Sequence, residues 1–249
     1  MKNTLTDSKE WFEDWFDSKF YHILYKNRDY SEAKKFIDNL LSHLNPKKDA
    51  VFCDVACGKG RHSIYINKMG YTIDGFDLSE NSILSAKDNQ SENLHFYVND
   101  IRIPLKVETY DYAFNLFTSF GYFEDENDNQ KSIDAIATSL KKNGLLVLDF
   151  MNCNKVIKNL TQTESKTMDG IQFNINKSVI NNYITKDISF NYNDTYYNFQ
   201  EKVKLITKEA FKSYFDAANL KIEGIFGDYN LNPFDIDSSD RLILVARKK

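Results

Sequence analysis

The chain contains one run, Val51 to His62, in which an apolar segment passes directly into a Gly-x-Gly turn and then into a helical pattern. An apolar run that ends at glycines is typical of a buried strand, because glycine accepts backbone angles that other residues resist. The helix that follows would present unpaired main-chain N–H groups in its first turn, and the bare turn allows a ligand to approach them. This strand, turn and helix constrain the fold more than any other feature, and they predict a nucleotide-cofactor loop.

Two details of the loop argue against a dinucleotide. The fingerprint G-x-G-x-x-G requires a third glycine, and Ser63 stands at that position. The fingerprint also serves an anionic pyrophosphate, whereas Asp54 places a carboxylate at the mouth of this loop. A carboxylate there suits a ligand that has an ammonium group and no phosphate, and S-adenosylmethionine is such a ligand. A capping role is the alternative for Asp54.

A second strand, predicted over residues 71–76, ends at Asp77, Leu78 and Ser79. Asp77 comes about 20 residues after the glycine turn, where an acidic side chain accepts hydrogen bonds from ribose hydroxyls. Leu78 would lie against the adenine, and Ser79 would cap the next helix. The segment therefore predicts a ribose-binding acid, with an N-cap as the alternative role for Asp77.

Two further strands end in residues that would complete this site. The strand over residues 94–98 is followed by Asp100 and Ile101, which would bond the adenine amino group and cover its face. The strand over residues 110–116 ends at Leu116. Because open parallel sheets bind ligands at the carboxyl ends of their strands, these residues predict one cofactor site at a single sheet edge.

In these motifs the chain resembles the class I S-adenosylmethionine-dependent methyltransferases, and the resemblance covers nearly its whole length. In that family the loop holds the methionine part of the cofactor, and the acids after the second and third strands hold ribose and adenine. The strand ends and the resemblance together imply a cofactor site made of Tyr30, Asp54, Ala56, Gly58, Gly60, His62, Asp77, Leu78, Asp100, Ile101 and Leu116. Ala56 departs from the family's usual first glycine, and His62 has packing in the first helix as its alternative.

Two motifs narrow the resemblance. Asp-Val-Ala-Cys-Gly-x-Gly-x-His, which ends at His62, and Phe-x-Ser-x-Gly-Tyr, which ends at Tyr122, resemble motifs of the N-methyltransferases that complete dimethylamino sugars. The segments around Tyr21 and Tyr30 are similar to that group too. The resemblance implies an enzyme of class EC 2.1.1.- that methylates an N or O atom of a small molecule in an enclosed site. Methylation of a protein or RNA, and a nucleotide-cofactor oxidoreductase, stay open as alternatives.

Methyl transfer from a sulfonium requires positioning more than acid–base chemistry, because the cofactor already carries an activated methyl group. Orientation contributes ~7–11 kcal/mol, whereas a general base is worth about 10²–10⁴-fold. An amine acceptor must still be neutral to attack. Tyr21 and Tyr122 are therefore the catalytic candidates, either through their hydroxyls or as an aromatic wall beside the sulfonium.

Strand and helix patterns alternate through the middle of the chain, which predicts a doubly wound α/β sheet. The resemblance implies the Rossmann-like strand order 3-2-1-4-5-7-6, with the last strand antiparallel. We expect a single domain over 1–249, with an N-terminal helical lid of two helices (1–45) and a cofactor-binding core (46–153). Period-two alternation predicts an antiparallel β insertion after the fifth strand (154–207), which would cover the acceptor, and a helix and hairpin complete the sheet (208–249).

Charge and composition bear on partners and compartment. The net charge is −4 and there is no basic run of five or more residues, which argues against a nucleic-acid partner. No apolar run of 18 residues occurs, and the polar face of the first helix is acidic, which argues against a membrane. The three cysteines form neither a paired framework nor a metal-ligand set, so we expect a reducing cytoplasm and no metal. The expected partner is a small-molecule acceptor, and a homodimer stays open.

Overall fold

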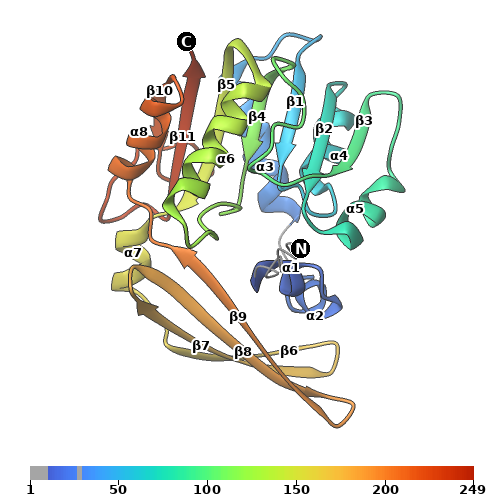
Figure 1. Cartoon of the computed structure of the whole chain (residues 1–249), viewed down its shortest axis with the longest axis vertical. Helices are drawn as coiled ribbons and strands as arrows, with labels where there is room; N and C mark the ends of the chain where they lie inside the picture. The colour runs from blue at the N-terminus through green and yellow to red at the C-terminus, as the bar shows by residue number, and fades with distance from the viewer. Residues whose placement is uncertain (1–10, 27–29) are drawn as a thin grey trace, which may run out of the picture.

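The computed structural model describes residues 11–26 and 30–249, whose main body is a seven-stranded sheet in the order β10-β11-β5-β4-β1-β2-β3 (Figure 1). Neighbouring strands are parallel, except that β11 is antiparallel to both β5 and β10. Numbered along the chain, this order is 3-2-1-4-5-7-6, which confirms the expected fold. The strands are β1 (Val51–Val55), β2 (Thr72–Asp77), β3 (Leu94–Val98), β4 (Tyr110–Asn115), β5 (Leu140–Met151), β10 (Leu220–Phe226) and β11 (Arg241–Lys248).

Helices cover both faces of this sheet, and alternate residues of a strand face opposite helical layers. On β5, Leu146 and Leu148 belong to the hydrophobic cluster that includes residues of α6 and α8, whereas Leu145 and Val147 belong to the cluster that includes residues of α3, α4 and α5. Strands buried on both faces read as continuous apolar runs, which explains why β5 and β11 show no polar alternation. The helices are α3 (Tyr30–Leu44), α4 (Arg61–Lys68), α5 (Glu80–Lys87), α6 (Glu126–Ser139) and α8 (Lys208–Ala217).

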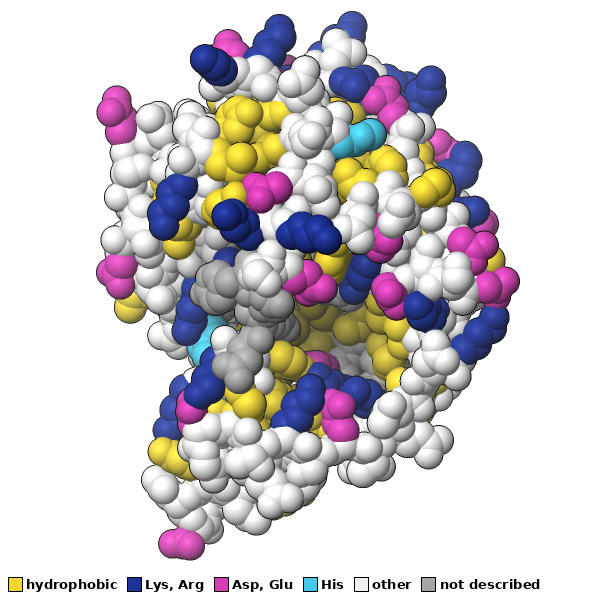
Figure 2. All heavy atoms as spheres, turned by 180° about the vertical axis from the view of Figure 1, so that it is seen from behind, with side chains coloured by type: hydrophobic (Ala, Val, Ile, Leu, Met, Phe, Trp, Pro, Cys, Tyr) yellow, Lys and Arg dark blue, Asp and Glu magenta, His cyan; other side chains and the backbone are white. Residues whose placement is uncertain are grey.

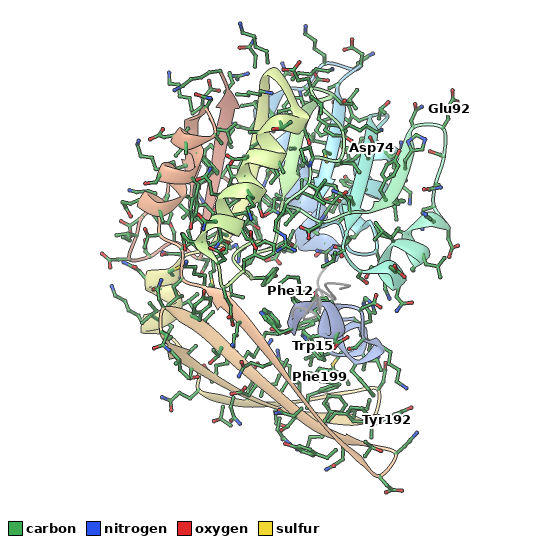
Figure 3. All side chains as sticks on the ribbon, in the orientation of Figure 1. Phe12, Trp15, Asp74, Glu92, Tyr192 and Phe199 are labelled. Carbon is green, nitrogen blue, oxygen red and sulfur yellow. The ribbon has the colours of Figure 1, made fainter. Side chains whose placement is uncertain are left out.

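A second sheet of four antiparallel strands, within the described residues, follows β5 and confirms the expected insertion. Two short helices, α1 (Trp11–Phe16) and α2 (Lys19–Leu24), lie between this sheet and the main body (Figure 1). Trp15 packs against Phe199 with ring centroids 4.6 Å apart, on the side of the helices that faces the second sheet (Figure 3). The four strands are β6 (Thr163–Met168), β7 (Ile171–Ile180), β8 (Tyr183–Tyr192) and β9 (Thr195–Lys204).

The N-terminal region differs from the predicted pair of helices. Its described residues form three helices, α1, α2 and α3. The first predicted helix is divided at Ser18, which caps α2 by accepting a hydrogen bond from the Tyr21 N–H at 3.1 Å. The predicted lid, residues 1–45, includes α3, but Phe36 and Ile37 of α3 are fully buried against the main sheet. The lid proper is therefore α1 and α2. Within residues 11–26 and 30–249, no helix combines the length and apolar character that crossing a bilayer requires.

The insertion also differs in detail from the sequence expectation. The alternating run 179–184 is not one strand, because the turn at Asn181 and Asn182, both with positive φ, joins β7 to β8 inside it. The first strand, β6, was not predicted because its sequence TESKTM has no apolar alternation. A short helix, α7 (Cys153–Lys158), precedes it and was also not predicted.

Candidate active site

A cavity of about 460 Å³ lies where the carboxyl ends of β1, β2, β3 and β4 face the lid helices. Figure 2 shows a hollow lined by hydrophobic side chains between the main body and the second sheet. Most of the predicted site residues meet there. The predicted residues that line the cavity are Tyr21, Asp54, Ala56, Gly58, His62, Asp77, Leu78, Asp100, Ile101, Leu116 and Tyr122.

Two predicted residues do not belong to this group. Gly60 is the N-cap residue of α4, with φ 76°, and a Cβ there would lie 2.5 Å from the ring of Phe96. The glycine is thus required for packing of the loop against the sheet, and it does not line the cavity. Tyr30 begins α3, and its side chain lies outside the described part of the structure.

The loop between β1 and α4 turns through left-handed backbone angles. Ala56 and Gly58 have φ values of 57° and 56°, and the Cys57 N–H donates to the Phe76 carbonyl at 2.9 Å. A side chain added at Gly58 would meet no atom within 4 Å, so bare main chain opens onto the cavity there. This is the cradle that a loop-bound ligand requires.

Asp54, the fourth residue of β1, is 2% exposed. Its Oδ2 accepts hydrogen bonds from the Ser63 hydroxyl at 2.6 Å and from the Ser63 N–H at 3.2 Å. Ser63, which stands where the dinucleotide fingerprint has its third glycine, thus donates both its hydroxyl and its main-chain N–H to the Asp54 carboxylate. Burial raises the pKa of Asp54 to about 6, and the two bonds from Ser63 oppose that rise only in part.

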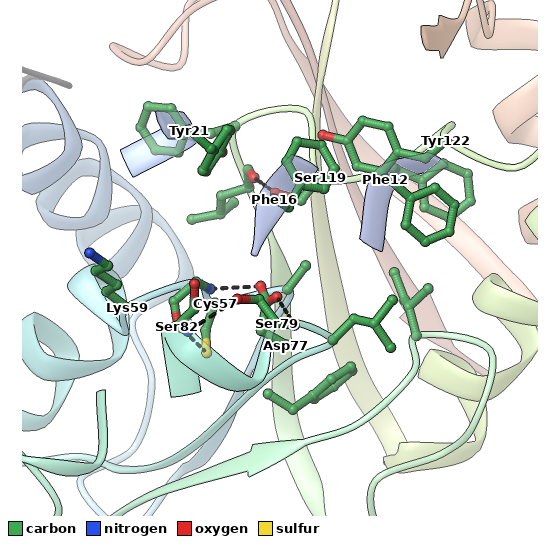
Figure 4. Close-up of a pocket in the computed structure, with 18 of the residues that line it drawn as sticks. Phe12, Phe16, Tyr21, Cys57, Lys59, Asp77, Ser79, Ser82, Ser119 and Tyr122 are labelled. Atoms are coloured by element: carbon green, nitrogen blue, oxygen red, sulfur yellow. Dashed lines mark hydrogen bonds between the residues drawn. The ribbon is translucent and has the colours of Figure 1, made fainter. Parts of the chain in front are cut away.

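Asp77 ends β2 and holds the loop in place. Its Oδ2 accepts from the Gly58 N–H at 2.8 Å, and its Oδ1 accepts from the Ser79 N–H at 2.9 Å. Burial raises the pKa of Asp77 above its ordinary value. Ser79 caps α5, as expected, by accepting from the Ser82 N–H at 3.0 Å. Asp77 is therefore not the N-cap, and its carboxylate faces the cavity across from the lid aromatics (Figure 4).

Asp17, which joins α1 to α2 in the lid, accepts hydrogen bonds from the N-terminus of α5, next to Asp77. Sequence reasoning missed this residue. Asp17 Oδ1 accepts from the Ser79 hydroxyl at 2.6 Å and from the Asn81 N–H at 3.0 Å. A second carboxylate, carried by the lid, thus caps the N-terminus of α5 beside Asp77. No local sequence pattern links residues so far apart in the chain.

At the third strand end, Asp100 lines the cavity with both carboxylate oxygens bonded to Arg102. The closest contact, from Arg102 Nη2 to Asp100 Oδ2, is 2.6 Å. Arg102 also pairs with Asp128 at 2.9 Å, and its guanidinium lies 4.6 Å from the ring centre of Phe123. Arg102 was not predicted, and it fixes the orientation of the acid assigned to adenine.

The turn after β4 is held by a buried ion pair. Phe117 and Thr118 both have positive φ, 58° and 61°, which side chains disfavour. Asp149, fully buried in β5, accepts from the Phe117 N–H at 2.7 Å. Arg241 in turn pairs with Asp149 at 2.8 Å and donates to the Thr118 hydroxyl at 2.8 Å. Sequence reasoning missed this pair, although an Asp within the apolar run of β5 was a usable signal.

This turn positions an aromatic wall of the cavity. The Phe117 ring stacks on His62 with centroids 5.0 Å apart and planes 9° apart. His62 thus lines the cavity and packs at the same time. Leu116, immediately before the turn, is buried and also faces the cavity.

The two catalytic candidates lie among the lid aromatics, across the cavity from the loop (Figure 4). The Tyr122 hydroxyl donates to the Thr118 carbonyl at 2.6 Å, and its ring packs 5.1 Å from that of Phe16. The Tyr21 ring lies 5.0 Å from the same Phe16. Both residues therefore form part of an aromatic wall, and the hydroxyl of Tyr122 is engaged with main chain.

The proteins to which this chain is similar include several that are named as methyltransferases. A protein of Geobacillus sp. (strain WCH70) named as a methyltransferase is 24% identical over 150 residues, which is 59% of this chain and 59% of that protein. The match thus spans less than two thirds of this relative's length. An S-adenosylmethionine-dependent methyltransferase from Clostridium acetobutylicum superposes with a TM-score of 0.77 at 18% identity, covering 92% of this chain and 96% of that chain. A sugar N-methyltransferase from Streptoalloteichus sp. gives 0.72 at 16% identity, covering 92% and 93%.

At such identities the likeness to solved structures shows the fold alone. The family assignment rests on a sequence model described as a methyltransferase domain, which matches residues 46–219. That range contains the glycine loop and all three strand-end acids. The chain therefore belongs to the class I S-adenosylmethionine-dependent methyltransferases.

Proposed function

We propose that this protein binds S-adenosylmethionine in the cavity and transfers its methyl group to an N or O atom of a small molecule. One observation carries the proposal. A single cavity is lined on one side by the glycine loop with Asp54, Asp77 and Asp100, and on the other by aromatic side chains of the lid. The cofactor supplies an activated methyl group, so the protein has to bind, orient and exclude water.

The residues present suit this cofactor. Asp54 would accept from the ammonium group, because a buried carboxylate favours a cationic partner. The bare main chain at Gly58 leaves room for the methionine part, and Asp77 would accept from the ribose hydroxyls. Asp100, oriented by Arg102, would accept from the adenine amino group.

The enclosure of the cavity supports a small acceptor. The lid contributes Phe12, Phe16 and Tyr21 to the lining, and β9 of the second sheet contributes Glu201 and Val203. A protein or RNA acceptor would need an open face at this end. We therefore infer that the insertion and the lid together cover the acceptor, and that the partner is a small molecule.

A nicotinamide cofactor is less well supported. The position where a dinucleotide loop has its third glycine holds Ser63, whose hydroxyl donates to Asp54. The close approach of α4 to β2 is made possible instead by Gly75, where a Cβ would lie 2.9 Å from the Ser63 hydroxyl. A buried carboxylate at the loop would also repel a pyrophosphate.

Ligand-induced stabilisation tests this proposal. S-adenosylhomocysteine at 100 times its dissociation constant should stabilise the protein by ~2.7 kcal/mol. For a chain of this length that corresponds to a rise of about 5–11 °C in melting temperature. NAD and NADP at the same concentration serve as matched controls and should leave it unchanged. A rise with NAD and none with S-adenosylhomocysteine would refute the assignment.

A further inference from the structure

The cavity has an acidic group that the cofactor does not explain. The carboxylates assigned to the cofactor all come from the main sheet, whereas Glu201 lines the cavity from β9 of the second sheet. Beside it lies Tyr25, the C-cap residue of α2, which lines the cavity too. Glu201 and Tyr25 therefore meet only where the lid and the insertion come together.

The hydrogen bonds of Glu201 fix its carboxylate. Its Oε1 accepts from Trp15 Nε1 at 2.7 Å and from the Tyr25 hydroxyl at 2.8 Å. Lys186, directly opposite on β8, lies 3.3 Å from Oε2 and also donates to the Tyr25 hydroxyl. Three donors from three elements thus hold one carboxylate, while Lys186 does not itself line the cavity.

These bonds join the lid to the second sheet, and a purely structural role would explain them. Two observations point to a ligand as well. The side chain of Glu201 is 15% exposed and lines the cavity, and its Oε2 receives only the longer contacts, 3.1 Å from Tyr25 and 3.3 Å from Lys186. The Tyr25 hydroxyl has a single proton, which its two contacts share, so three donors face the about four acceptor positions of an ionised carboxylate and one position is left for another donor.

The surroundings of Glu201 favour a cation as that donor. The ring of Tyr21 lies 5.0 Å from that of Tyr25, and Phe16 and Tyr122 extend this aromatic lining of the cavity. The faces of such rings attract cations. An anionic acceptor would instead meet the Glu201 carboxylate directly, because Lys186, the partner of Glu201 at 3.3 Å, does not line the cavity. The site is thus matched to a small ammonium group with an apolar neighbour.

We propose that Glu201, with Tyr25 beside it, is the acceptor-binding group and that the acceptor is a small amine; this rests on the proposed methyl transfer. The ammonium form of the acceptor donates to Glu201, which takes one proton and leaves a neutral amine. The nitrogen lone pair then forms the N–C bond to the methyl group. The C–S bond breaks, its electron pair goes to sulfur, and the proton on Glu201 passes to solvent.

Trp15 supplies a local reporter, because its indole N–H is bonded to Glu201. The chain has two tryptophans, so a Trp11→Phe parent leaves Trp15 as the sole indole fluorophore. We would titrate this parent, saturated with S-adenosylhomocysteine, with cyclohexylamine and with its matched alcohol, cyclohexanol. The amine should change the emission saturably and the alcohol should not. Adding Glu201→Gln should weaken the amine response at least about tenfold, as expected for loss of a charge-assisted bond.

The matched control is Glu164→Gln, which removes a carboxylate paired with Lys177 at 3.1 Å on the same sheet but outside the cavity lining. It should leave the amine response unchanged. Equal responses to amine and alcohol, or no saturable response in the parent, would overturn the proposal, and neither outcome depends on the folding of a Glu201 variant. Calorimetry with S-adenosylhomocysteine on the parent tests the proposed function separately: binding without amine selectivity refutes only the role of Glu201.

Discussion

Replacing Asp54 with Asn should have opposite effects on stability and on cofactor affinity. Both bonds from Ser63 reach the same carboxylate oxygen, so the Asn Oδ1 can keep them while the charge disappears. Burial raises the pKa of Asp54 from 3.8 to about 6, which corresponds to about 3 kcal/mol against the ionised form above pH 6. The ligand-free variant should therefore be more stable than the parent at pH 8, by about 1–3 kcal/mol, or about 2–12 °C.

The pH dependence follows from the direction of the shift. Because the folded pKa of Asp54 is raised, its protonated form stabilises the fold at low pH, and this contribution is lost as the pH rises from about 4 to about 6. The advantage of Asp54→Asn should thus be small near pH 4, grow to pH 6 and stay constant above it. Urea unfolding of both proteins across this range measures it.

The affinity should change in the other direction. An ammonium group that loses its carboxylate partner loses ~1.5–3 kcal/mol, so the variant should bind S-adenosylhomocysteine about 10- to 150-fold more weakly in calorimetry at pH 8. For the parent, affinity should fall as the pH drops below about 6, because protonation of Asp54 removes its charge. A variant that is less stable at pH 8 and binds with unchanged affinity would refute the reasoning and leave Asp54 a structural residue.

Three further substitutions test other parts of the site. Asp77→Asn should weaken S-adenosylhomocysteine binding about 10- to 150-fold in calorimetry, and it should also lower the free energy of unfolding by about 1–3 kcal/mol, because each carboxylate oxygen accepts one main-chain N–H and the Asn amide can keep only one of the two bonds; unchanged affinity would contradict its ribose role. Tyr122→Phe should lower the free energy of unfolding by about 1 kcal/mol, because its hydroxyl donates to a main-chain carbonyl at 2.6 Å, but leave turnover nearly unchanged, as expected for an aromatic wall; a large loss of turnover would show instead that the hydroxyl acts in catalysis. Arg241→Met should lower the free energy of unfolding by about 3–5 kcal/mol, because Asp149 is left buried without its partner. Its control, Arg247→Met, breaks a pair that is more than one-third exposed and should cost at most about 1 kcal/mol in the same urea titration; equal losses would show that burial is not decisive.

Local signals in the sequence were sufficient for the main sheet and for the residues at the strand ends that line the cavity. The strand-end acids Asp54, Asp77 and Asp100 each follow a short apolar run, and the parallel arrangement brings such positions to one edge. The predicted strand boundaries were wrong where the local pattern of apolar and polar residues fits more than one arrangement of strands. The run 179–184 alternates in the same way on both sides of a tight turn, so period alone does not separate β7 from β8.

The side of the cavity lined by the lid and the second sheet could not be predicted in the same way. Glu201, Tyr25 and Asp17 owe their positions to contacts between segments far apart in the chain, and no spacing rule connects them. Asp149 and Arg241 are a different case. Asp149 interrupts the apolar run 145–151 of β5, and Arg241 directly precedes the apolar run 242–246 of β11. Because buried charges are normally paired, these positions already indicated an ion pair between the two strands.

The packing of the lid on the second sheet also orders events during synthesis. The bond from Trp15 to Glu201 joins residues 186 positions apart, and the rings of Trp15 and Phe20 pack against aromatic side chains of β8 and β9. At about 5–20 residues per second, translation delivers those strands roughly 10–40 s after the N-terminal helices emerge. During that interval the lid helices have no apolar surface of the second sheet to cover. The side of the cavity that is lined by the lid and the second sheet is therefore among the last parts of the structure to assemble.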